Sequence, residues 1–78
     1  MTIPPYTPIP CALYDRFEAA ATLKQRLKLG LIQDDGQEVA IRGLPLQFNT
    51  QNGVEFGLFE DEHHLRHWIR LDRVKLLD

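Results

Sequence analysis

The chain of 78 residues is long enough for one domain with a thin hydrophobic core, because a domain this small buries only about 60% of its unfolded surface. The lone cysteine, Cys11, excludes an internal disulfide, and no four-ligand cysteine and histidine pattern is present. The formal net charge of −2 argues against nonspecific nucleic-acid binding, which draws its affinity from neutralised phosphates. An acidic domain is better suited to a basic partner.

The same composition also indicates the cellular compartment. No apolar run approaches the roughly 20 residues that a membrane helix needs. The opening residues, MTIPPYTPIP, lack the basic region and apolar core of an export signal. One unpaired cysteine also favours a reducing compartment. We therefore expect a cytoplasmic protein without membrane association, and a monomer.

The chain divides into an extended proline-rich segment and one domain. Residues 1–10 carry all but one of the prolines, which fix φ and remove backbone donors. Residues 11–78 form the single domain. It begins with a predicted helix over 11–23, in which Leu13 and Phe17 share one side with two alanines at helical spacing.

After the helix, the hydrophobic period changes to two, which is typical of half-buried strands. Asp35-Gly36 and Asn52-Gly53 are strong signals for tight turns. Gly43 and Pro45 indicate that the second strand bends and stops near Leu44. Five strands are expected, over about 27–31, 38–44, 54–58, 65–71 and 74–77.

This order of elements predicts a mainly β fold with one N-terminal helix. A flat sheet of five short strands cannot bury both of its faces, so it must curl, with the helix covering an open end. We predict a small five-strand bent barrel of the Sm-like or SH3-like kind.

The outward side of the helix carries two carboxylates, Asp15 and Glu18, about one turn apart. On residue chemistry alone, a solvated helix face is the favoured interpretation. The functional alternative is an acidic docking edge for a basic groove, with Tyr14 as an aromatic contact.

Three histidines lie close together at His63, His64 and His67. In a strand, the two consecutive ones point to opposite faces and no third ligand is placed, so no metal is expected. His67 is expected at the edge of the core.

Catalytic patterns are weak. Cys11 has no evident base beside it, and the acids Asp34 and Asp35 lie in a turn with no feature that would raise their pKa. The chain also has no glycine-rich phosphate loop. We expect neither an enzyme nor a cofactor.

Trp68 lies between Arg66 and Arg70 on one strand face. This pattern suits stacking of an RNA base. The competing interpretation is a tryptophan that covers the second face of the sheet, with the arginine stems packed on it, and we favour this one.

The opening run Tyr6-x-Pro8-Ile9-x-Cys11-x-x-Tyr14-Asp15-x-x-Glu18-x-Ala20 resembles the start of the Rof-type Rho-binding antiterminators. The tail Ile69-Arg70-Leu71-Asp72-Arg73-Val74 is similar to the closing segment of that family. The strand signals between them fall in matching order, so the resemblance covers about residues 6–77. One departure is the loop expected at 48–52, which is basic in the family and carries no basic residue here.

The resemblance implies an Sm-like barrel that binds the transcription termination factor Rho. Family members block the primary RNA-binding sites of Rho and so reduce termination. The partner-binding residues that it implies here are Tyr6, Tyr14, Asp15 and Glu18, with no direct nucleic-acid contact. The alternative is an Sm-like module that binds single-stranded RNA through the strand of Trp68.

Overall fold

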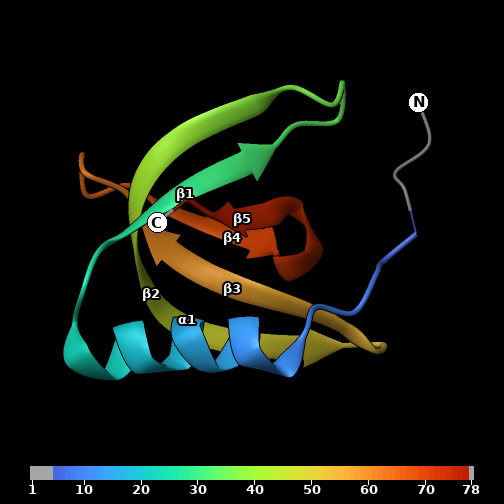
Figure 1. The fold of residues 1–78 in the computed structure, drawn as a ribbon, viewed down its shortest axis with the longest axis horizontal. Coiled ribbons are helices and arrows are strands. Elements are labelled where there is room, and N and C mark those ends of the chain that lie inside the picture. Colours follow the sequence, from blue (N-terminus) through green and yellow to red (C-terminus); the bar gives the residue numbers. More distant parts are fainter. Residues whose placement is uncertain (1–4, 78) are drawn as a thin grey trace.

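The computed structural model describes residues 5–77. One helix is followed by five antiparallel strands in a single sheet, so the fold is mainly β, as predicted (Figure 1). Helix and strands are α1 (Cys11–Leu23), β1 (Leu27–Ile32), β2 (Glu38–Gln51), β3 (Val54–Glu60), β4 (Arg66–Arg70), the short 3-10 helix η1 (Leu71–Arg73) and β5 (Val74–Leu76).

The helix α1 occupies the residues predicted for it. Pro10 precedes its first turn with extended backbone angles, a position where the missing N–H of proline costs little. The helix ends at Lys24, which adopts the left-handed conformation at φ 55°. The next backbone N–H, that of Gln25, donates to the carbonyl of Ala20 at 2.9 Å, which closes the last turn.

Strand β2 is the element that bends the sheet. Its first half, from Glu38 to Gly43, pairs with β1, and its second half, from Leu44 to Gln51, pairs with β3. Figure 1 shows β2 as a long curved ribbon that passes from the upper hairpin down to the side of α1. One strand therefore belongs to two differently oriented halves of the sheet.

The prediction that the second strand stops near Leu44 is wrong, because β2 continues to Gln51. The register shifts between Pro45 and Gln47, so proline sits at an irregularity of the ladder, where its lack of an N–H is tolerated. As a result, most of the loop expected at 48–52 is strand, and the tight turn is limited to Asn52 and Gly53.

The end of the chain also differs in detail from the prediction. Strand β4 is shorter than the expected 65–71, because Leu71 begins the 3-10 helix η1. The side chain of Leu71 is fully buried, so this turn serves to place an apolar residue in the core. Strand β5 follows directly and pairs with β1.

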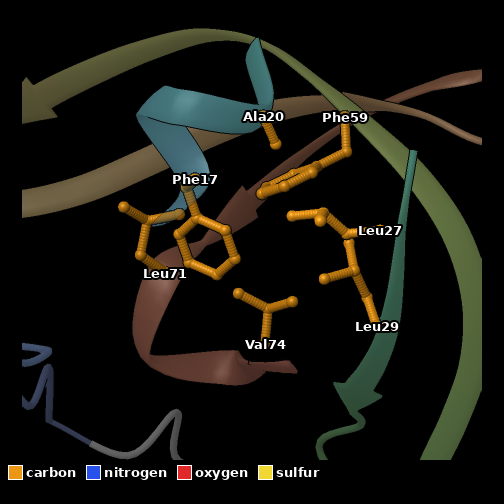
Figure 2. Close-up of a cluster of buried hydrophobic side chains, with 7 residues drawn as sticks. All are labelled: Phe17, Ala20, Leu27, Leu29, Phe59, Leu71 and Val74. Atoms are coloured by element: carbon orange, nitrogen blue, oxygen red, sulfur yellow. The ribbon is translucent and has the colours of Figure 1, made fainter. Parts of the chain in front are cut away.

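The core lies inside the curve of the sheet and is closed by α1 (Figure 2). The rings of Phe17 and Phe59 meet edge to face, with centroids 5.8 Å apart and planes at 81°. Gly57 is required beside them, because a Cβ there would lie 2.7 Å from the ring of Phe59. The buried apolar residues are Phe17, Ala20, Leu27, Leu29, Phe59, Leu71 and Val74.

The sheet is bent but not closed. Its strand order is β4-β3-β2-β1-β5, so within residues 5–77 the strands β4 and β5 are its two edges and do not pair with each other. The helix lies alongside β2 (Figure 1). The coarse fold prediction is therefore confirmed as a five-strand sheet with one helix.

Candidate functional site

The two helix carboxylates, Asp15 and Glu18, are both exposed to solvent on α1. The helix buries its opposite side through Phe17 and Ala20, so the same spacing that fills the core turns the two acids outward. Tyr14 is half-buried at the border between these two sides. The structure thus places an aromatic ring next to an acidic surface.

Tyr14 is held in place by the sheet. Its ring packs on Phe48 of β2 at a centroid distance of 5.3 Å and a tilt of 47°. Burial raises the pKa of the Tyr14 hydroxyl, and the negative charges of Glu18 and Glu55 raise it further. The ring is therefore an anchored, neutral group with two carboxylates near its hydroxyl.

Tyr6 reaches the same acidic surface from the segment before the helix. Its hydroxyl donates a hydrogen bond to Oε1 of Glu55 at 2.9 Å. Burial, the hydrogen bond to Glu55 and the charge of Glu55 raise the pKa of Tyr6 to about 12. Glu55, near the start of β3, is thus the group that connects Tyr6 with Tyr14.

A second set of contacts fixes the segment before the helix. The guanidinium of Arg70 lies 5.9 Å from the centre of the Tyr6 ring, within the range of a cation–π contact. Nε and Nη2 of Arg70 donate to the two carboxylate oxygens of Asp72, at 2.6 and 2.9 Å. The backbone N–H of Thr7 donates to the same carboxylate at 2.9 Å. The proline-rich segment is therefore tied to the end of the sheet at these positions.

The sequence-predicted site residues do not form one tight cluster. Tyr6 and Tyr14 are linked through the charge of Glu55, and Glu18 acts on Tyr14 alone, whereas Asp15 is an exposed neighbour on the same helix. Glu55 and Asp72 were missed as site residues. Glu55 lies in an expected strand and Asp72 lies between the last two expected strands, and no local pattern indicates that the segment of Tyr6 and Thr7 folds back on them.

Comparison with known proteins adds no relative, because the chain matches no family model, no curated protein and no solved structure. The functional interpretation of this surface therefore depends on its own geometry and on the resemblance of the opening residues.

The second surface of interest is the face of β3 and β4 that points away from the core. Trp68 stands opposite Leu58 there and remains 52% exposed. A hollow of about 330 Å³ lies beside it, lined by Asn49, Gln51, Phe56 and Trp68. The tryptophan thus covers this face only in part.

The two arginines next to Trp68 both have carboxylate neighbours. Arg70 is held by Asp72 in the two-pronged contact described above. Nε of Arg66 lies 3.6 Å from Oε1 of Glu60, and its side chain is 62% exposed. The charge of Arg70 is therefore balanced inside the chain, whereas that of Arg66 remains largely exposed to solvent.

The histidines take part in the structure of the turn between β3 and β4. Nε2 of His67 lies 2.8 Å from Oδ2 of Asp61. The other oxygen of Asp61 accepts the backbone N–H groups of His63 and Leu65, at 2.8 and 3.0 Å. These contacts, led by the hydrogen bond from His67, lower the pKa of Asp61 to about 2. His67 is an exposed residue that fastens this turn, and not a member of the core edge.

The remaining candidates have structural surroundings. Asp34 lies 3.4 Å from a guanidinium nitrogen of Arg73, and the carboxylate of Asp35 accepts the N–H of Gln37 at 2.9 Å. Cys11 is exposed at the first position of α1. Within residues 5–77, no three histidine, cysteine or acidic side chains gather as metal ligands, and no helix is long and apolar enough to cross a membrane.

Proposed function

We propose that the chain binds the transcription termination factor Rho and blocks its primary RNA-binding sites, which reduces Rho-dependent termination. The observation that carries this proposal is the exposed pair Asp15 and Glu18 beside the anchored ring of Tyr14. The resemblance of residues 6–20 to the Rof-type antiterminators supports the choice of partner.

The proposed mechanism is competition by charge and by volume. A cleft that holds RNA is basic, and an acidic surface associates with it more quickly and in a defined orientation. Asp15 and Glu18 would supply the charge, and the fixed ring of Tyr14 would supply a rigid contact at little entropic cost. Once seated, the domain excludes RNA without turnover and without a cofactor.

Glu55 increases the acidic character of the same surface. It lies close enough to Tyr14 to raise the pKa of its hydroxyl, and it accepts the hydrogen bond of Tyr6. We therefore extend the proposed contact surface from the four sequence-predicted residues to Glu55.

We also propose that the bent sheet is an open form of the Sm-like or SH3-like barrel. The partner switch in the middle of β2 supports this, because it lets one continuous strand turn around the core. Such a fold does not define a function by itself, so the Rho proposal depends on the surface and not on the barrel. We place the protein in the cytoplasm, where the free thiol of Cys11 would stay reduced.

The direct test is size-exclusion chromatography of the full chain with Rho, with and without an excess of competing RNA. We expect co-elution with Rho alone, loss of the complex when RNA is added, and a weaker complex as the salt concentration rises. A complex that persists unchanged in the presence of saturating RNA would contradict competition for the RNA sites.

A further inference from the structure

The hollow beside Trp68 combines two kinds of side chain. Phe56 and Trp68 supply aromatic surface, and Asn49 and Gln51 supply amide groups that both donate and accept hydrogen bonds. Asn49 stands opposite Phe56 across the β2–β3 ladder, so amide and aromatic groups lie on one face of the sheet. The core-forming Phe59 and the helix lie on the other face.

We propose that this hollow binds an unstacked base of single-stranded RNA. Bases that are splayed out of a single strand stack on aromatic side chains and hydrogen-bond along their edges. A base can stack on the aromatic rings and hydrogen-bond with the two amides at the same time. An aliphatic or aromatic protein side chain would fill the space but would leave the amides of Asn49 and Gln51 without partners.

The charges around the hollow determine how such binding depends on salt. Arg70 is held by Asp72, with its side chain only 16% exposed, and is not free to bind phosphate. Arg66 is exposed and has a single 3.6 Å contact with Glu60, an interaction that is weak at a surface. One phosphate contact is therefore available on this strand, next to Trp68.

This site differs from phosphate-driven binding, which the net charge of −2 disfavours. Stacking and amide contacts do not depend on the net charge of the domain, whereas one phosphate contact gives a log–log salt slope of about −0.7 for a single strand. We expect affinity to fall only about threefold between roughly 50 and 200 mM salt. The inference is independent of the proposal on Rho, because its first test contains only the chain and RNA.

Trp68 is the one tryptophan of the chain, so its fluorescence reports directly on the hollow. The full chain is titrated with an oligoadenylate of about eight nucleotides, within the span of small single-strand binding domains. We expect saturable quenching. The double variant Asn49→Ala with Gln51→Ala should weaken binding by about tenfold, as expected for a lost base contact.

The matched control is Thr50→Ala, which lies between the two amides on β2 but points to the other face of the sheet. It should bind the oligonucleotide like the unchanged chain, and Arg66→Gln should flatten the salt slope. Absence of quenching, or equal binding by the double variant and by Thr50→Ala, would overturn the inference. If Rho but not RNA quenched the fluorescence of Trp68, and the double variant lost affinity for Rho, the inference would also be overturned. The hollow would then belong to the protein interface.

Discussion

The hydroxyl of Tyr6 donates to a carboxylate oxygen of Glu55 across 2.9 Å, which joins two residues 49 positions apart in the chain. This contact ties the segment before the helix to the beginning of β3. The carboxylate of Glu55 also lies close enough to Tyr14 to raise the pKa of its hydroxyl. The charge of Glu55 therefore acts on both tyrosines of the chain, although Glu55 is distant from each of them in sequence.

The first prediction concerns the titration of Tyr6. Its pKa of about 12 lies above the ordinary tyrosine value of 10.0, so the fold favours the neutral phenol. The resulting stabilisation is complete below about pH 10 and is lost as the pH rises through about 12. Phenolate absorbance in the variant Tyr14→Phe, which leaves Tyr6 as the remaining tyrosine, should show this late titration.

Replacing Glu55 with glutamine then separates the causes of the shift. Glutamine keeps an acceptor oxygen but removes the negative charge. The pKa of Tyr6 should move down toward 10 but stay above it, because burial is its largest cause. An unchanged titration curve in Glu55→Gln would mean that Glu55 does not contribute.

The second prediction concerns the acidic edge of the helix. The double variant Asp15→Lys with Glu18→Lys should abolish binding to Rho, because both carboxylates become charges that a basic cleft repels. Since both side chains are exposed, the circular dichroism spectrum and the melting temperature should change little. Affinity is measured by titrating labelled domain with Rho at low salt.

A charge-matched pair of variants distinguishes a local site from a general charge effect. Asp15→Asn with Glu18→Gln removes two negative charges, whereas Gln37→Lys with Gln47→Lys adds two positive charges at exposed positions outside α1. Both pairs raise the net charge by the same amount. We expect the first pair to weaken binding at least tenfold more than the second, and equal losses would remove the helix edge from the site.

The sequence predicts the elements of this fold better than their connections. Helical spacing defines α1 to the residue, because the core needs Phe17 and Ala20 on one side. The length of β2 is mispredicted because Pro45 normally ends a strand, and only the register of the pairing shows that it lies at a bulge. Residue preferences and periodicity predict the conformation of one segment, whereas a bulge depends on how two strands pair.

The candidate site was predictable only in part for the same reason. Asp15 and Glu18 are recognisable because helix periodicity separates their side from the buried one. The roles of Glu55 and Asp72 depend on long-range contacts with Tyr6 and Thr7, across 49 and 65 positions. Residue spacing carries no information on such contacts in a single sequence.

The third prediction concerns acid stability. The pKa of Asp61 is lowered from 3.8 to about 2, so its carboxylate stabilises the fold above about pH 4, and this contribution is lost as the pH falls through about 2. Asp61→Asn keeps an acceptor for the backbone N–H groups but loses the charged partner of His67. The variant should melt several degrees lower at neutral pH.

The comparison of both proteins across pH tests the assignment. The difference in melting temperature between the unchanged chain and Asp61→Asn should shrink from pH 4 to pH 2, because protonation removes the same charge that the substitution removes. Exposed Glu62, next in sequence, offers the control Glu62→Gln, which should melt close to the unchanged chain at neutral pH. A difference that stays constant over this range would exclude the titration of Asp61 as its cause.

The last prediction concerns the aromatic contact that fastens the helix to the sheet. Phe17 is fully buried, and its ring meets that of Phe59 edge to face in the centre of the core (Figure 2). Phe17→Ala removes a large side chain and leaves a cavity, at a cost of about 3–5 kcal/mol. A single hydrophobic core in a domain of roughly this size rarely supplies more than about 3–5 kcal/mol, so much or all of the folded population should be lost.

A milder substitution keeps the prediction measurable if the alanine variant does not fold. Phe17→Leu retains most of the volume but loses the ring contact, and should cost about 1–2 kcal/mol in urea denaturation. The control is Leu23→Ala at the end of the same helix, where a side chain that is 64% exposed should contribute less than about 0.5 kcal/mol.

Because α1 carries the acidic edge, loss of the Phe17 contact should weaken Rho binding in proportion to unfolding, whereas the charge variants should weaken it without unfolding. If Phe17→Leu reduced the affinity of the folded fraction as strongly as the charge reversal does, the helix edge would act through its packing and not through its carboxylates.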